Sequence, residues 1–399
     1  MTDLTIRLAP LRAGRNMGLL QQVAEDDQLS GREVTLAGQT MLSFASCSYL
    51  GLEMEPALKE GAIAATRAFG TQFSASRAFI SAPPYAEAEV LLTQMTGRPT
   101  LLVPSTSLGH QAALPLLVGS EDLVLIDVQA HASLHVAAAL LKAQGVRVQV
   151  VAHSAPEQIA RKLRATDAPK VWLLIDGIYS MIGDIAPFEA LDRLLAQDSR
   201  LTLYIDDAHA TGWCGARGQG IALEYWPDHP RVLVALSLNK SFACAGGALA
   251  LANDDQAEAV RAFGPAMTFS GPVQPPMLGA IIASARLHLS DELAPRQADL
   301  RARIRRFNDG ARRLGLPLAC HGDTPMRYIR IGDLARTGAV AMALQGAGVF
   351  LASVAPPAVS TRDVGLRMTL TSHHTMDDID YLLAVLAEAL QAADREAAE

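Results

Sequence analysis

Blocks of apolar and polar residues alternate along the chain and predict a regular succession of helices and strands between about residues 85 and 253. Short runs of apolar, β-prone residues indicate strands, and the amphipathic stretches between them indicate helices. The predicted strands are 99–104, 122–126, 146–151, 170–175, 200–205 and one on each side of Lys240; the predicted helices are 85–96, 108–117, 131–143, 156–165 and 187–197. Continuous apolar strands separated by helices are typical of an α/β fold with a mostly parallel sheet buried on both faces.

The chain on either side of this region has a different pattern. Residues 1–54 are predicted to form an N-terminal arm with a helix and a hairpin. Helices from Gln274 to Gly315 lead into a smaller α+β unit, whose predicted elements are strands 327–331, 349–354 and 364–370, helix 334–345 and a last helix from Thr375. We therefore expect an arm (1–54), a large domain (55–287) and a small C-terminal domain (288–399).

Composition narrows the classes of function. Half of the 399 residues are hydrophobic and the formal net charge is −7, which argues against a broad nucleic-acid or membrane-surface footprint. Residues 337–361 carry no charge, but glycines and prolines interrupt them, so we expect no membrane span. The four cysteines form no CxxC pair and no metal-type cluster, which indicates a reducing cytoplasm without disulfides or a metal site.

A lysine in the stretch Arg231–Gly247 is the first candidate for chemistry. Two apolar runs flank a loop of small residues that holds Lys240. Burial lowers the pKa of an ammonium group, and an amine so tuned attacks carbonyls, as Schiff-base formation requires. The alternative is that Lys240 simply reaches solvent from the loop.

In sheets of this kind, ligands bind beyond the carboxyl ends of the strands. Ser105, Thr106 and Ser107 follow strand 99–104 and open a helix, where hydroxyl and N–H groups could bind phosphate or merely cap the helix. His131 follows strand 122–126 and could stack on a flat ring or start a helix. No GxGxxG motif follows the first strand, so a dinucleotide site has no support.

Asp206 and His209 follow strand 200–205, three residues apart, and could reach one ring from the same side. A cap-and-turn role for the acid is the alternative. Together with Lys240, His131 and the phosphate cup, they supply what pyridoxal 5′-phosphate requires: an amine for its aldehyde, an anion for its ring nitrogen and an anchor for its phosphate. Because these four features occur together at successive strand ends, they support a pyridoxal 5′-phosphate site more strongly than any one of them alone.

These residues resemble motifs of the α-oxoamine synthase family of fold-type I pyridoxal-phosphate enzymes, over roughly residues 40–390. The DxAH motif is similar to Asp206–His209, TLSK to Ser237–Lys240, and EGxFSMDGD to Asp176–Asp184. The resemblance implies an aminotransferase-like fold of type I, with a large cofactor-binding domain. It also implies that the cofactor is held by Lys240, Asp206, His209, His131, Ser180, Ser237, Thr106, Ser107 and, from the neighbouring subunit, Ser270. Lys240, Asp206, His209 and His131 would be the catalytic residues.

The substrate side of the resemblance is less regular. The family's RLRLTLT motif is similar to Gly365–Leu370, which makes Arg367 the expected ligand of an amino-acid carboxylate, rather than a partner in a surface salt bridge. The family's SNDYLG reads SCSYLG here, so Cys47 replaces an asparagine that contacts substrate. Gln72 and Phe73 add bulk to a segment that is glycine-rich in the family, and the HxxLE that follows is replaced by Pro83–Glu87. These departures lie where the amino acid and acyl thioester enter.

The resemblance implies a biosynthetic acyltransferase that works in the cytoplasm as a homodimer, with its active site at the interface. It would condense a small α-amino acid with an acyl thioester of coenzyme A or a carrier protein, releasing CO2 and an α-amino ketone. An aminotransferase or a lyase on the same fold is the alternative enzyme, although His209 stands where aminotransferases usually place a tyrosine. A catalytically silent binding protein with this fold is the other alternative.

Overall fold

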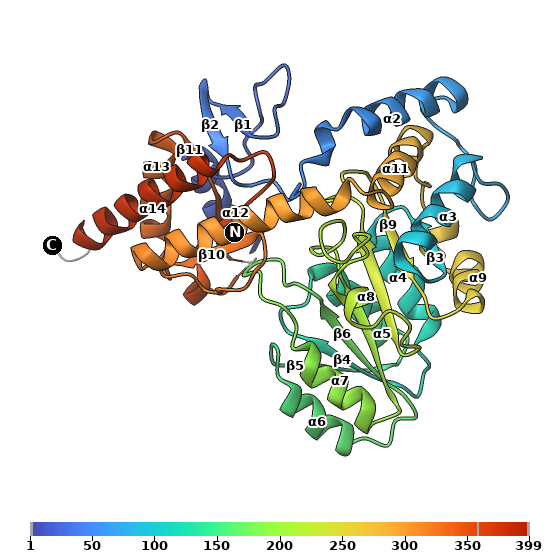
Figure 1. Ribbon diagram of the computed structural model, residues 1–399. Helices are drawn as coiled ribbons and strands as arrows, with labels where there is room; N and C mark the ends of the chain where they lie inside the picture. Colours follow the sequence, from blue (N-terminus) through green and yellow to red (C-terminus); the bar gives the residue numbers. More distant parts are fainter. Residues whose placement is uncertain (1–2, 357–358, 397–399) are drawn as a thin grey trace. The chain divides into compact units, whose positions relative to one another are not determined.

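A computed structural model describes residues 3–356 and 359–396 of the chain (Figure 1). The chain forms two compact units. The large unit comprises residues 52–180 and 185–297, and the small unit comprises residues 1–51, 181–184 and 298–399. The predicted domain boundaries, between residues 54 and 55 and between residues 287 and 288, remain a prediction.

A seven-stranded sheet forms the centre of the large unit, in the order β3-β9-β8-β7-β6-β4-β5. The strands are β3 (Thr100–Val103), β4 (Leu123–Asp127), β5 (Arg147–Val151), β6 (Val171–Asp176), β7 (Leu201–Asp206), β8 (Val232–Ser237) and β9 (Gly247–Ala250). β9 runs antiparallel to both of its neighbours, and the pairs from β8 to β5 are parallel. The predicted mostly parallel α/β sheet is therefore confirmed.

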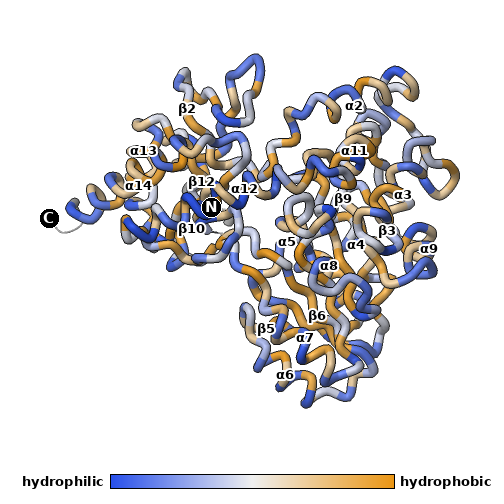
Figure 2. Tube along the Cα trace, viewed as in Figure 1, coloured by the Kyte–Doolittle hydropathy of each residue, from blue (hydrophilic) through white to orange (hydrophobic). Residues whose placement is uncertain are grey.

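Helices cover both faces of this sheet because its central strands are apolar on both sides (Figure 2). One face packs against α4 (Thr106–Leu117) and α5 (Ala132–Ala143), whose buried residues share a hydrophobic cluster with alternate residues of β4, β6 and β7. α6 (Pro156–Arg164) and α7 (Phe188–Gln197) lie over the other face (Figure 1). The large unit also contains α8 (Ile221–Tyr225), α9 (Asp254–Phe263) and α10 (Pro265–Thr268).

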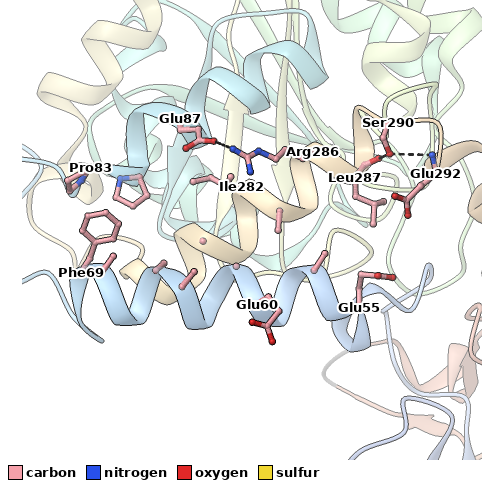
Figure 3. Close-up of a pocket in the computed structure, with 18 residues that line it drawn as sticks. Glu55, Glu60, Phe69, Pro83, Glu87, Ile282, Arg286, Leu287, Ser290 and Glu292 are labelled. Carbon is pink, nitrogen blue, oxygen red and sulfur yellow. Dashed lines mark hydrogen bonds and ion pairs between the residues drawn. The ribbon is translucent and has the colours of Figure 1, made fainter.

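Three further helices of the large unit pack beside the sheet: α2 (Pro56–Phe69), α3 (Pro84–Thr96) and α11 (Pro275–His288), with a short 3-10 helix, η1 (Leu52–Met54), before them. α2 and α11 cross at Gly61 and Gly279, where a Cβ on Gly61 would lie 2.5 Å from the Gly279 carbonyl oxygen. Only glycine permits so close an approach of two helix backbones. A groove of about 880 Å³ lies along these helices (Figure 3); Pro83, Pro84 and Glu87 line it, and none of the predicted catalytic, cofactor-binding or substrate-binding residues does.

The small unit contains two three-stranded sheets. β1 (Glu33–Leu36) and β2 (Gln39–Ser43) form the predicted hairpin, and β11 (Val349–Phe350) adds to β2 in parallel. β10 (Met326–Arg330), β13 (Gly365–Thr369) and β12 (Ala352–Val354) form an antiparallel sheet. The helices are α1 (Asp3–Asn16), α12 (Leu293–Leu314), which begins in the large unit, α13 (Leu334–Gly346), α14 (Met376–Glu396) and the short η2 (Thr361–Asp363).

The prediction of one strand over 349–354 was wrong. The chain leaves the first sheet after Phe350 and joins the second at Ala352, so the single apolar run serves two sheets. Hydrophobicity reports that a segment is buried, but it does not report which neighbour each residue pairs with.

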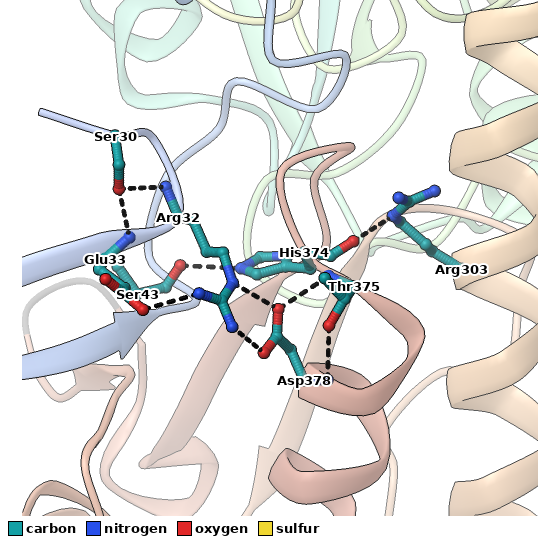
Figure 4. Close-up of polar contacts among 8 residues, drawn as sticks. All are labelled: Ser30, Arg32, Glu33, Ser43, Arg303, His374, Thr375 and Asp378. Carbon is teal, nitrogen blue, oxygen red and sulfur yellow. Dashed lines mark hydrogen bonds and ion pairs between the residues drawn. The ribbon is translucent and has the colours of Figure 1, made fainter.

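The N-terminal segment is connected to the C-terminal helix by a half-buried ion pair between Arg32 and Asp378 (Figure 4). Arg32 donates to both oxygens of Asp378 over 2.8 and 2.6 Å, and Asp378 in turn caps α14 by accepting from the backbone N–H of Thr375. His374 contacts the Ser43 carbonyl through Nε2 at 3.0 Å and stacks on Phe44. Among the helices that the structure describes, none combines the length and the hydrophobicity needed to span a bilayer.

Candidate active site

Three neighbouring strands of the large sheet end together and bring the candidate residues to one edge. Asp176, the last residue of β6, pairs with Asp206, the last residue of β7, and Asp206 pairs with Ala235 of β8. β8 runs on for two residues to Ser237, three residues before Lys240. Because the strands are parallel, the loops that follow them gather at this edge.

Asp206 is held in a fixed orientation and is almost inaccessible to solvent. One carboxylate oxygen accepts from the Ala208 backbone N–H at 3.0 Å, and the other lies 2.9 Å from Nε2 of His110. Burial raises the pKa of Asp206, but the hydrogen bond to His110 and the interactions with His110, Lys240 and His131 outweigh it and hold the pKa well below the ordinary value. Asp206 therefore stays ionised in a buried environment, where an unpaired charge would be strongly destabilising.

Asp176 has the opposite electrostatics. Burial and the neighbouring Asp206 carboxylate raise the pKa of Asp176 well above its ordinary value. Asp176 accepts from the backbone N–H of His131 at 2.9 Å, which fixes the start of α5. The His131 side chain caps α5 through Ser133, and partial desolvation lowers its pKa, which favours the neutral ring that can stack on a flat aromatic group.

Asp207 and His209, one and three residues after Asp206, have different surroundings. His209 is buried, and its carbonyl accepts from Nε1 of Trp213 at 2.7 Å. Asp207 turns away and accepts from the Ala222 backbone N–H at 3.0 Å. Burial raises the pKa of Asp207 to about 7, so it is a weaker candidate than Asp206 for a lasting negative charge.

Lys240 lies in a tight turn between β8 and β9, where the sequence predicts it. The turn is closed by backbone hydrogen bonds between Leu238 and Cys244 (2.7 Å) and between Leu238 and Gly246 (3.1 Å). The side chain of Asn239 adds a bond to the Gly246 N–H at 2.8 Å. Lys240 itself is half-buried, so its amine sits on a rigid turn and remains accessible.

The N-terminus of α4 lies directly over β9. Ser105 caps the helix by accepting from the Leu108 N–H at 3.2 Å, and the first N–H groups of a helix have no partner within it. The Thr106 hydroxyl donates to the Leu236 carbonyl at 3.0 Å, which joins the helix to β8. A Cβ at Gly247 would lie 2.5 Å from the Thr106 nitrogen, so glycine is needed to keep this end of the helix in place.

The remaining large-unit candidates lie in loops. Ser180 follows β6, and the Ser270 hydroxyl donates to the Ala266 carbonyl after α10. Gln72 donates to the Ser74 hydroxyl at 2.8 Å, and the Phe73 N–H donates to the side chain of Gln274, also at 2.8 Å. Phe73 is thereby tied to the segment that carries Ser270.

Arg367 and Cys47 belong to the small unit and are in contact there. Nη2 of Arg367 lies 3.6 Å from Sγ of Cys47. Burial lowers the pKa of Arg367, but the neighbouring Cys47 and Tyr49 outweigh it and raise the pKa. Arg367 lies on β13, between Tyr328 of β10 on one side and Ala352 of β12 on the other. Its guanidinium therefore projects from a strand that is paired on both sides.

These side chains fit pyridoxal 5′-phosphate. A buried, ionised carboxylate suits a protonated ring nitrogen, and a neutral histidine suits the ring face. A helix N-terminus crossing a glycine, where no side chain would intervene, suits a phosphate. With Lys240 on its rigid turn, the fold and the site define a fold-type I enzyme of the pyridoxal-phosphate class.

Two residues that the sequence analysis did not assign belong to this group: His110 and Tyr204. His110 lies one helical turn after Thr106 on α4, and Tyr204 lies two residues before Asp206 on β7. The available signal was spacing, because residues four apart on a helix and two apart on a strand share a face.

Comparisons with known proteins place the chain in a family. A family model described as aminotransferase class I and II matches residues 40–386. An 8-amino-7-oxononanoate synthase from Maricaulis maris is 33% identical over 410 residues, which cover 100% of both chains. Another from Pseudomonas entomophila is 32% identical over 400 residues, covering 98% of this chain and 99% of the relative.

Solved structures have the same fold. A serine palmitoyltransferase from Sphingomonas wittichii aligns with a TM-score of 0.89 at 22% identity, covering 99% of this chain and 100% of that one. An 8-amino-7-oxononanoate synthase from Francisella tularensis aligns with a TM-score of 0.73 at 19% identity, covering 88% and 98%.

The chain belongs to the aminotransferase class I and II family, and within it to the α-oxoamine synthases. This membership confirms the predicted fold class, the pyridoxal 5′-phosphate cofactor and the class of reaction. The protein is an acyltransferase of the kind that condenses an α-amino acid with an acyl thioester and releases CO2.

Proposed function

We propose that the protein condenses L-alanine with a medium-chain acyl thioester. The observation that carries this proposal is full-length similarity, above 30% identity, to relatives named 8-amino-7-oxononanoate synthase. In 8-amino-7-oxononanoate, a ketone stands beside a carbon that bears an amino group and a methyl group. Alanine gives that group of atoms when its α-carbon loses a proton and attacks a thioester carbonyl, the thiol of the thioester leaves, and the carboxylate departs as CO2.

When bound, the cofactor's protonated ring withdraws electrons from the substrate's α-carbon and stabilises the negative charge that develops there. Asp206 holds the proton on the ring nitrogen, and His131 covers the ring face. Lys240 provides the amine that binds the cofactor's aldehyde, and Nζ afterwards carries the proton taken from the α-carbon. His209 and Ser180 position the ring at its phenolic oxygen.

The hydroxyls of Ser107 and Ser237 and the N-terminus of α4, where Thr106 contributes its backbone N–H, bind the phosphate. Arg367 binds the amino acid's carboxylate, for which a guanidinium provides two parallel N–H donors. Cys47, Gln72 and Phe73 shape the pocket for the substrate side chain and the acyl group. These assignments rest on the contacts of the large and small units taken separately, and on the motifs that match the family.

We also propose that the enzyme works as a homodimer in the cytoplasm. Phe79 and Phe269 are 90% and 88% exposed and belong to two segments joined by a hydrogen bond from Ser76 to the Thr268 carbonyl at 2.9 Å. A second copy would cover these aromatic rings and bring Ser270 to its neighbour's phosphate. None of the four cysteines forms a disulfide, in line with a reducing compartment. Sedimentation analysis of wild type and of Phe79→Ser/Phe269→Ser would test the dimer, because the double variant should dissociate more readily.

Replacing Lys240 tests the chemistry. Wild-type protein with added pyridoxal phosphate should turn yellow, and borohydride should trap the cofactor covalently. Lys240→Ala should lose both properties, whereas Lys142→Ala, a variant of an exposed lysine on α5, should keep them. CO2 release from alanine with acyl thioesters of increasing length would then identify the acyl donor. A colourless wild type, or amino-group exchange without CO2 release, would refute the proposal.

A further inference from the structure

His110 links the N-terminal turn of α4, where the phosphate is proposed to bind, to the Asp206 carboxylate at the end of β7. It lies on α4, one turn beyond Thr106, and its ring is fully buried against β7. Nε2 of His110 lies 2.9 Å from Oδ2 of Asp206, and Nδ1 lies 3.0 Å from the hydroxyl of Tyr204. The rings of His110 and Tyr204 meet edge to face at 5.5 Å. The same helix, α4, therefore supplies the free N–H groups of its N-terminus and, through His110, a hydrogen bond to the Asp206 carboxylate.

The local geometry follows from periodicity. Tyr204 and Asp206 are two residues apart on β7, so their side chains project from the same face of the sheet. α4 packs on that face, because its Ala112, Ala113 and Leu114 share a hydrophobic cluster with Tyr204. A histidine on the buried side of α4 then meets both side chains at once.

The hydrogen-bonding groups of Asp206, His110 and Tyr204 are complementary. An ionised carboxylate accepts and cannot donate, so Nε2 of His110 must carry the hydrogen. Nδ1 faces the Tyr204 hydroxyl, also buried, and that hydroxyl can donate to a neutral ring or accept from a protonated one. The chain of hydrogen bonds runs from Tyr204 through His110 to Asp206.

We propose that His110 is a positioning residue that, with Tyr204 behind it, fixes and keeps ionised the Asp206 carboxylate, so that the ring nitrogen of the bound cofactor stays protonated. The inference rests on the proposed role of Asp206 at that nitrogen. Lys240, His131 and Asp176 also act on Asp206 electrostatically, but His110 is the side chain that holds it by a direct hydrogen bond.

The test measures the ring nitrogen itself. Each protein is loaded with pyridoxal phosphate labelled with ¹⁵N in the ring, and solid-state NMR reports whether that nitrogen carries a proton. Wild type should show a protonated nitrogen at pH 8. His110→Phe should shift the population toward the unprotonated form and weaken pyridoxal-phosphate binding about 10- to 100-fold, the loss expected for a buried charge-assisted hydrogen bond.

Two milder variants guard against misfolding. His110→Gln keeps an N–H donor that can reach Asp206 and should retain a protonated ring nitrogen. Tyr204→Phe removes only the hydroxyl and should produce a smaller shift than His110→Phe. His374→Phe, a substitution of another buried histidine in the small unit, should lower the thermal midpoint without changing the ¹⁵N signal.

The outcomes separate the inference from the proposed function. If wild type binds the cofactor with a protonated ring nitrogen, and His110→Phe and Tyr204→Phe leave signal and affinity unchanged, the role of His110 is refuted while the proposed function stands. If Phe variants shift the signal and His110→Gln restores it, the role is supported. A wild type that binds no pyridoxal phosphate would overturn both.

Discussion

Arg367 and Cys47 form a contact in which a guanidinium nitrogen lies 3.6 Å from a thiol sulfur. The sulfur replaces an asparagine side chain that the family pattern places beside the substrate. Sulfur is a weak hydrogen-bond acceptor, so Cys47 occupies one side of the guanidinium without engaging it as a carbonyl oxygen would. In the proposed role of Arg367, this weak contact competes less with a substrate carboxylate than an amide oxygen would.

Substituting Cys47→Asn should raise the KM for the amino acid about 3- to 10-fold, because an amide oxygen would compete with the substrate carboxylate for one N–H group, a hydrogen bond worth about 0.5–1.5 kcal/mol. Steady-state kinetics at saturating acyl thioester would measure it. Cys47→Ala removes the sulfur without adding an acceptor and should leave the KM nearly unchanged. An unchanged KM in Cys47→Asn would show that Cys47 does not limit access to Arg367.

Gly247→Ala should disturb the phosphate end of the site. The added methyl would lie 2.5 Å from the Thr106 nitrogen, so the first turn of α4 would have to move. We expect at least a tenfold loss of affinity for pyridoxal phosphate and about 1–3 kcal/mol of destabilisation from overpacking. Cofactor titration and urea unfolding of the apoprotein would measure the two effects.

A matched glycine provides the control for this substitution. Gly346, at the end of α13, has nothing within 4 Å of a Cβ position, so Gly346→Ala should be neutral or slightly stabilising. Equal losses in the two variants would mean that the effect at Gly247 is not steric.

His374 should make the protein less stable in mild acid. Burial lowers the pKa of His374 to about 4 from an ordinary value of 6.5, so the folded state binds fewer protons than the unfolded state between these pH values. The stabilisation is complete above pH 6.5 and is lost as the pH falls toward 4, by up to about 3 kcal/mol. Urea midpoints from pH 4 to pH 8 should decline on the acid side, and His374→Gln should flatten that decline.

A second loss of stability follows at lower pH. Burial raises the pKa of Asp378, but hydrogen bonds from Arg32 and Thr375 outweigh it and bring the pKa to about 2. The stabilisation from Asp378 is complete above its unfolded pKa and disappears as the pH falls through the folded value. Arg32→Gln should therefore flatten the stability profile below pH 4. Arg312→Gln, at an exposed pair with Asp309, should leave the profile as it is.

The sheet and the loop that carries Lys240 could be predicted because both depend on local patterns. The runs around Lys240 are apolar, short and separated by small residues, and they became β8 and β9 with little change. The positions of Asp176 and Asp206 could also be predicted, because both end strands of a parallel sheet, and such strand ends lie at one edge.

His110 and the break at Leu351 could not be predicted in the same way. A single histidine inside an apolar helix does not reveal which buried group it will meet, because that depends on the packing of α4 on β7. The run from Val349 to Val354 reads as one strand, and only the positions of β2 and β13 determine where it divides. Both features depend on partners far away in the sequence.

The pairing of the N-terminal hairpin with late parts of the chain has a consequence for biosynthesis. Arg32 and Asp378 are 346 residues apart, and β2 receives its neighbour only when β11 has been made. At about 5–20 residues per second, the ribosome needs on the order of tens of seconds to reach these partners. All seven strands of the large sheet are complete before then. The nascent chain thus exposes an unpaired edge of β2 after every strand of the large sheet has been made, and such an edge is a binding surface for chaperones until β11 covers it.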